Sequence, residues 1–96
     1  MSEQVKSVRL SAGLRRIAGS KAVEVPTGPQ TTARDLLRRL CDVNPALADH
    51  ILTPNGELDD GIMMIVAGRH IDFQQGLDTP IGAEDDVMII PPLSGG

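Results

Sequence analysis

One amphipathic helix constrains the fold of this chain more than any other feature. Thr32 and Asp35 have the spacing of a capping box, with the shorter Asp in place of Glu. The apolar residues that follow recur at helical spacing, and they are Ala33, Leu36, Leu37, Leu40 and Cys41. Arg34, Arg38 and Arg39 are left for the solvent side or its flanks. Asn44-Pro45 ends the helix, because a residue before proline disfavours the α region.

The segments on either side of this helix are predicted to be strands. Residues 5–10 and 21–25 alternate between two faces, which indicates two strands of a hairpin with a longer loop. Leu14 and Ile17 lie three apart in that loop, as in a single helical turn. A turn at residues 68–70 precedes a short predicted strand that contains Ile71 and Phe73, and an acidic turn at 82–86 leads into the last strand at 87–90. One long helix covers one face of one sheet, so the order of elements predicts a two-layer α+β domain.

Residues 62–67 and 87–90 are apolar at both alternating positions. We expect one set to contain Met63, Ile65, Val87 and Ile89, and the opposite set to contain Ile62, Met64, Val66, Met88 and Ile90. One set must face away from the helix. Central strands that are hydrophobic throughout are one interpretation. The other is an exposed apolar face that binds a protein, for which methionine is well suited.

Length and composition exclude several classes of protein. The 96 residues indicate one domain, which we place at 1–90, followed by an extended tail at 91–96. The net charge is −4, and the only aromatic residue is Phe73, so no basic run or stacking set points to nucleic acid. The single cysteine, Cys41, excludes an internal disulfide and leaves no zinc cluster, and no metal site is expected. The N-terminal residues lack a signal-peptide pattern and no apolar run suits a membrane span, so we expect a cytoplasmic protein without membrane contact.

No catalytic set is recognisable in the sequence. His50 and His70 have no serine or cysteine nucleophile at a familiar spacing, and no glycine-rich nucleotide motif is present. The sequence therefore predicts a protein that is not an enzyme and holds no cofactor of its own. The chemically distinctive group with access to a partner's active site is the carboxylate of Gly96.

The last six residues favour a tail that another protein can accept. Pro91 and Pro92 remove two backbone donors, so the sheet cannot continue through them. Six extended residues reach roughly 20 Å. The tail carries little side-chain bulk near its end, and a frayed terminus is the alternative interpretation. The predicted partner-binding residues are Phe73, Pro91, Pro92, Leu93, Ser94 and Gly95.

Three stretches give the whole chain a resemblance to the ubiquitin-like sulfur carriers, the group that includes the small subunit of molybdopterin synthase (MoaD) and the thiamin carrier (ThiS). Residues 10–19 are similar to that group's strand followed by Ala, Leu-Arg-x-x-Ala-Gly. The helix exit at Asn44-Pro45-x-Leu47 resembles theirs, and residues 85–96 resemble their acidic turn, last strand, paired prolines and Gly-Gly end. Residues 54–60 and 70–77 look more like carriers of cysteine biosynthesis and archaeal small modifiers.

The resemblance implies a β-grasp (ubiquitin-like) fold, a mixed sheet with one main helix packed on one face. It also implies that an E1-like adenylating enzyme uses ATP to activate Gly96, and that a sulfur donor converts it to a thiocarboxylate. A recipient sulfurtransferase or the large subunit of a synthase would then take the sulfur for molybdopterin, cysteine or thiamin, with the chain as a small non-catalytic carrier or subunit. The alternatives are a modifier joined through Gly96 to target lysines and a plain interaction module.

Overall fold

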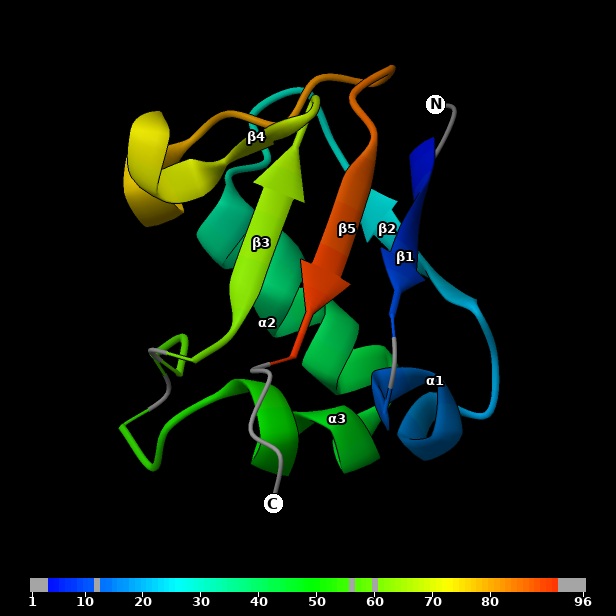
Figure 1. The fold of residues 1–96 in the computed structure, drawn as a ribbon. Helices are drawn as coiled ribbons and strands as arrows, with labels where there is room; N and C mark the ends of the chain where they lie inside the picture. The colour runs from blue at the N-terminus through cyan, green and yellow to red at the C-terminus, as the bar shows by residue number, and fades with distance from the viewer. Residues whose placement is uncertain (1–3, 12, 56, 60, 92–96) are drawn as a thin grey trace.

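The computed structural model describes residues 4–11, 13–55, 57–59 and 61–91. Within these ranges, five strands form one mixed sheet in the order β2-β1-β5-β3-β4 (Figure 1). The strands are β1 (Gln4–Leu10), β2 (Ala22–Thr27), β3 (Met63–Val66), β4 (Arg69–His70) and β5 (Val87–Ile90). β1 and β5 run parallel, and the other neighbouring strands are antiparallel. β5 is therefore a central strand with a neighbour on each side.

Helix α2 (Ala33–Val43) crosses one face of this sheet, behind β3 and β5 in Figure 1. Two shorter helices, α1 (Gly13–Ala18) and α3 (Pro45–Ile51), lie together at the end of the sheet where β5 stops. The predicted α+β class and the β-grasp fold are confirmed. The helical turn predicted at Leu14 and Ile17 is also confirmed, and Pro45 opens the short helix α3 directly after α2 ends.

The predicted capping box fixes where α2 begins. The Thr32 hydroxyl accepts a hydrogen bond from the Asp35 backbone N–H at 3.3 Å, and the Asp35 carboxylate accepts one from the Thr32 N–H at 3.2 Å. This backbone hydrogen bond from Thr32 is the main reason that the pKa of Asp35 lies below its ordinary value. All five apolar positions read from the helical spacing are buried against the sheet.

The hairpin after β3 differs from the prediction. The turn lies at Ala67-Gly68, and both residues have positive φ, as a two-residue hairpin turn requires. The predicted strand containing Ile71 and Phe73 is wrong, because these residues form the 3₁₀ helix η1 (Ile71–Phe73). The physical reason is local capping, in which the His70 Nδ1 accepts a hydrogen bond from the Asp72 N–H at 3.0 Å and turns the chain away from the sheet.

The two faces of β3 and β5 are also divided differently from the prediction. Met64 pairs with Ile89 and Val66 with Val87, and all four are buried towards α2. The outward set is Met63, Ile65, Met88 and Ile90. The expected grouping was correct within each strand and wrong between the strands. The two residue numbers of each β3–β5 pair add up to the same odd total. An odd-numbered residue of β3 therefore always lies beside an even-numbered residue of β5, on the same face of the sheet.

Within the described residues, no helix is long and apolar enough to cross a membrane.

Candidate functional site

The end of β5 determines how the tail leaves the domain. The Ser11 N–H donates a hydrogen bond to the Ile89 carbonyl at 3.2 Å, which continues the parallel ladder one residue past β1. The next donor in that ladder would be the backbone nitrogen of residue 91, which is Pro91 and carries no hydrogen. Pairing therefore stops where the tail begins. Pro91 is half-buried there, while the predicted site residues Pro92, Leu93, Ser94, Gly95 and Gly96 lie outside the described residues.

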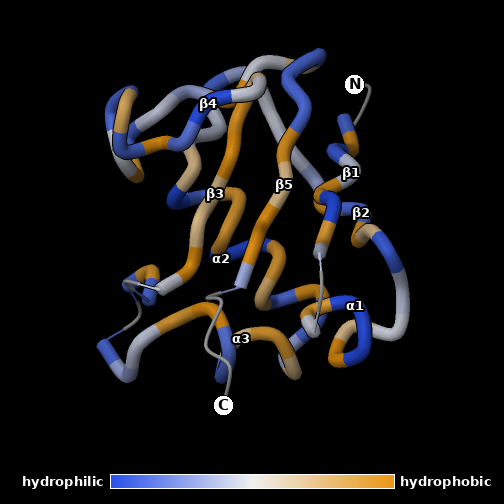
Figure 2. Tube along the Cα trace, in the orientation of Figure 1, coloured by the Kyte–Doolittle hydropathy of each residue, from blue (hydrophilic) through white to orange (hydrophobic). Residues whose placement is uncertain are grey.

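An apolar surface lies beside this exit, on the sheet face opposite α2. We call it the open face, and it consists of Met63, Ile65, Met88 and Ile90. The four side chains form two cross-strand rows, because Met63 lies opposite Ile90 and Ile65 lies opposite Met88. Met63 is 38% exposed and the other three are half-buried. Figure 2 shows the same apolar character along β3 and β5.

Charged groups border the open face on the β1 side. The guanidinium of Arg9, on β1, forms a bidentate pair with the Asp86 carboxylate, with the Nε–Oδ1 contact at 3.0 Å. Both side chains are about half exposed, so this pair contributes little to the stability of the fold. An apolar centre with a charged border is the usual arrangement of a protein-binding surface.

Phe73 lies at the other end of the sheet from the tail exit. η1 follows β4, which pairs with Ile65 and Val66, whereas the tail follows Ile90, which pairs with Met63 at the start of β3. Figure 1 shows the same separation between η1 and the end of β5. Phe73 is 77% exposed, and its ring meets His70 edge-on, with ring centroids 6.3 Å apart. The structure therefore does not bring Phe73 together with Pro91.

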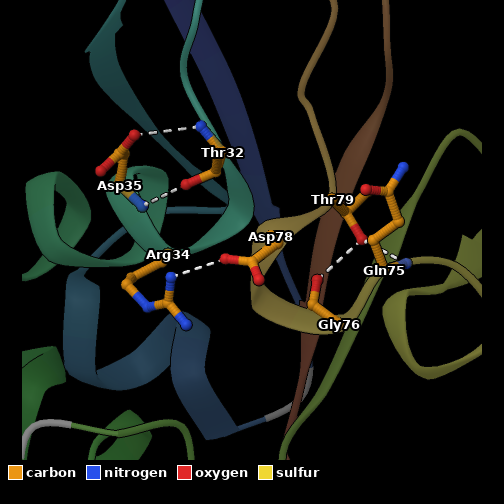
Figure 3. Close-up of polar contacts among 7 residues, drawn as sticks. All are labelled: Thr32, Arg34, Asp35, Gln75, Gly76, Asp78 and Thr79. Carbon is orange, nitrogen blue, oxygen red and sulfur yellow. Dashed lines mark hydrogen bonds and ion pairs between the residues drawn. The ribbon is translucent and has the colours of Figure 1, made fainter.

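Hydrogen bonds hold the segment that carries Phe73. The amide of Gln74 donates to the Val66 and Arg69 carbonyls, each at 3.1 Å. The second 3₁₀ helix, η2 (Gly76–Asp78), is joined to the start of α2 by the Arg34–Asp78 ion pair at 2.7 Å (Figure 3). Phe73 is thus an exposed aromatic side chain on a segment that hydrogen bonds hold in place.

Cys41, the single cysteine of the sequence, is buried on the sheet-facing side of α2. Burial, with a smaller contribution from Asp42, raises the pKa of its thiol, so the thiolate is disfavoured. Among the described residues, no three His, Cys, Asp or Glu side chains gather where a metal ion could bind.

The model of the ThiS family matches residues 8–96. The chain belongs to the ThiS family. Within the curated relatives, small archaeal modifier protein 1 of Haloferax volcanii is 33% identical over 88 residues, which cover 92% of this chain and 97% of that protein. A second relative, from Archaeoglobus fulgidus, carries the provisional name sulfur carrier protein. It is 32% identical over 65 residues, which cover 68% of this chain and 74% of that protein.

The solved structures agree with this family assignment. The crystal structure of SAMP1 from Haloferax volcanii superposes with a TM-score of 0.85 at 32% identity, covering 96% of this chain and 99% of that one. The members of this ThiS-family group are small carriers or modifiers, and the resemblance read from the sequence is confirmed. The open face is the feature that the sequence did not define, because only the β3–β5 register shows which apolar residues point outward.

Proposed function

We propose that this protein is a sulfur carrier whose Gly96 carboxylate is adenylated and then converted to a thiocarboxylate. The observation that carries the proposal is the end of β5, where Pro91 stops the hydrogen-bond ladder beside an exposed apolar surface. Membership of the ThiS family and the relative named as a sulfur carrier support it.

The chemistry explains the division of labour between the chain and its partners. A carboxylate is a poor electrophile, so an E1-like enzyme would use ATP to form an acyl-adenylate at Gly96. A sulfur donor would displace AMP and leave sulfur bound to the chain as an ionised thiocarboxylate. Glycine suits this position because it has no Cβ to widen the tail or restrict its φ. ATP belongs to the activating enzyme, and the chain itself is proposed to bind no cofactor.

We further propose which molecule receives the sulfur. The residues that resemble the small subunit of molybdopterin synthase favour a molybdopterin precursor, received by the large subunit of a synthase. A cysteine or thiamin precursor is the alternative within the same chemistry.

A second candidate function has its own support. The relative that matches 92% of this chain is named a modifier, so Gly96 could instead be joined to lysines of other proteins. Both functions require the same activated glycine.

The decisive measurement is the intact mass of the chain after incubation with an E1-like activating enzyme, ATP and a sulfur source. We expect the mass to rise by about 16 Da, since sulfur replaces one of the two oxygens of the Gly96 carboxylate. The matched control omits ATP and should leave the mass unchanged. A series of larger conjugates in cell extract would favour the modifier function, and an unmodified chain with several competent activating enzymes would contradict both.

The open face should supply affinity for the activating enzyme. Met63→Ala is expected to weaken binding by about 1–4 kcal/mol, as an interface hot spot does, because Met63 is exposed beside the tail exit. Phe73→Ala tests a separate predicted contact, at the opposite end of the sheet from the open face, and is expected to weaken binding by about 1–4 kcal/mol as well. Calorimetric titration measures both, and thermal unfolding checks that the fold is unchanged.

Glu24→Ala is the matched control for this pair, because Glu24 is exposed on the same sheet face but lies on the edge strand β2. It is expected to change binding by less than about 0.5 kcal/mol. Equal losses in Met63→Ala and Glu24→Ala would show that the enzyme does not dock on the open face.

A further inference from the structure

Two neighbouring hollows lie between the chain segment that follows α3 and the 3₁₀ helices η1 and η2. The first hollow has a volume of about 190 Å³ and the second a volume of about 200 Å³. Leu58 and Leu77 line both of them, so the two hollows share a wall. An engineered cavity of about 150 Å³ holds a benzene molecule, so each hollow has room for one large side chain of a partner. The open face is a different surface, because its four residues line neither hollow.

The first hollow has an apolar floor. Four leucines form this floor, and they are Leu37, Leu52, Leu58 and Leu77. Leu37 is buried and the other three are half-buried, so a side chain that enters would cover apolar surface still in contact with water. The charges at the rim largely cancel. Arg34 is already paired with Asp78, and Arg38 shares the rim with the Glu57 carboxylate. The first hollow therefore suits an uncharged, apolar side chain.

The second hollow combines an apolar floor with an acidic rim. Ile62 and Ile71 contribute to the floor, and the carboxylates of Asp59 and Asp72 border it. Both aspartates are exposed, and the Asp59 carboxylate can accept more than the one backbone N–H that it binds at 2.9 Å. His70 also borders this hollow, and its Nδ1 already accepts a hydrogen bond from the Asp72 N–H. A long basic side chain can lay its methylenes on such a floor while its charged end reaches the carboxylates.

Hydrogen bonds hold both sides of the two hollows in place. On one side the Thr53 N–H donates to the Glu57 carbonyl at 2.7 Å. On the other side the Thr79 hydroxyl donates to the Gly76 carbonyl at 2.7 Å and accepts from the Gln75 N–H at 3.1 Å (Figure 3). The hollows are therefore present in the chain on its own, before any partner binds.

We propose that these two hollows dock an extended segment of a partner protein, in which one residue separates an apolar side chain from a basic one. Alternate side chains of an extended segment lie on one face, roughly 7 Å apart, so a single segment can fill two neighbouring hollows. Charge complementarity selects the basic residue, because Asp59 and Asp72 border the second hollow. The net charge of −4 also attracts a basic segment. The interaction is non-covalent and does not depend on the chemistry proposed for Gly96.

The test titrates short capped peptides into the isotope-labelled full chain and follows the backbone amide signals by NMR. The first peptide is Gly-Leu-Ser-Lys-Gly. In the second, leucine and serine are exchanged, so that the apolar and basic side chains lie on opposite faces of an extended peptide. We expect the first peptide to cause saturable shifts at residues 57–59, 70–72 and 76–77, and to bind at least about fivefold more tightly than the second. Glutamate in place of its lysine should also weaken binding by at least about fivefold.

Variants of the protein test the acidic rim. Asp72→Asn should weaken binding of the first peptide by about threefold, since one of two carboxylates is lost. Asp72→Lys leaves the rim with one charge of each sign, so it should remove the preference for the lysine peptide over the glutamate peptide. The matched control is Asp42→Asn, which neutralises an exposed carboxylate of α2 that lines neither hollow and should leave binding unchanged. Circular dichroism checks that each variant is folded.

Equal affinities of the first and second peptides for the folded chain would overturn the inference. Shifts confined to the open face would overturn it as well, and so would the absence of any saturable shift. These outcomes are independent of the proposed function, which is tested separately by the gain of sulfur in the intact mass.

Discussion

Replacing Gly95 with valine is expected to abolish adenylation of Gly96 while leaving the affinity of the body for the activating enzyme nearly intact. A Cβ at this position widens the tail, and a branched side chain also restricts its φ and χ1. The body still presents Met63, Ile65, Met88 and Ile90, which do not change. Pyrophosphate exchange measures adenylation, and calorimetric titration measures binding. The matched control is Ser94→Ala, which removes a hydroxyl without adding bulk and should remain active.

Extending the chain beyond Gly96 tests the same mechanism in another way. The extra residues convert the reactive carboxylate into a peptide bond, so adenylation should again be lost and binding retained. If an extended chain is adenylated without prior trimming, Gly96 is not the site of chemistry and the carrier function fails.

Truncating Leu40 to alanine is expected to lower the free energy of unfolding by about 2–5 kcal/mol, because it removes a fully buried side chain and leaves a cavity. Leu40 lies on the face of α2 that packs against the sheet. Chemical denaturation monitored by circular dichroism measures the change. Arg38→Ala is the control, since Arg38 lies in the same helix but is exposed. This substitution should lower the free energy of unfolding by less than about 0.5 kcal/mol.

The neighbouring Arg39 would be a poor control, although the helical spacing alone places it on the solvent side or its flank. Its guanidinium donates to the hydroxyl of Thr31 at 2.9 Å, and Thr31 is 3% exposed. Similar losses for Leu40→Ala and Arg38→Ala would mean that burial against the sheet is not what stabilises α2.

The helix and the open face show why the sequence predicts some features and not others. The limits of α2 follow from short-range chemistry, namely the Thr32–Asp35 box and the Asn44-Pro45 exit, and such signals are local in the chain. The open face depends instead on how β3 and β5 pair across the residues 67–86 that lie between them, and a shift of one residue exchanges the buried and exposed sets. The 3₁₀ helix at Phe73 was missed because a histidine cap outweighed the strand-like spacing of Ile71 and Phe73.

The central position of β5 has a mechanical consequence for the proposed function, in which an activating enzyme takes up the tail. A pull on the tail acts along β5, which is bonded to β1 on one side and to β3 on the other. The load falls in shear on both rows of hydrogen bonds at once, whereas an edge strand could be peeled away one bond at a time. Lys6 adds three further bonds to the turn that precedes the strand. The domain should therefore stay folded when a partner applies force to the tail.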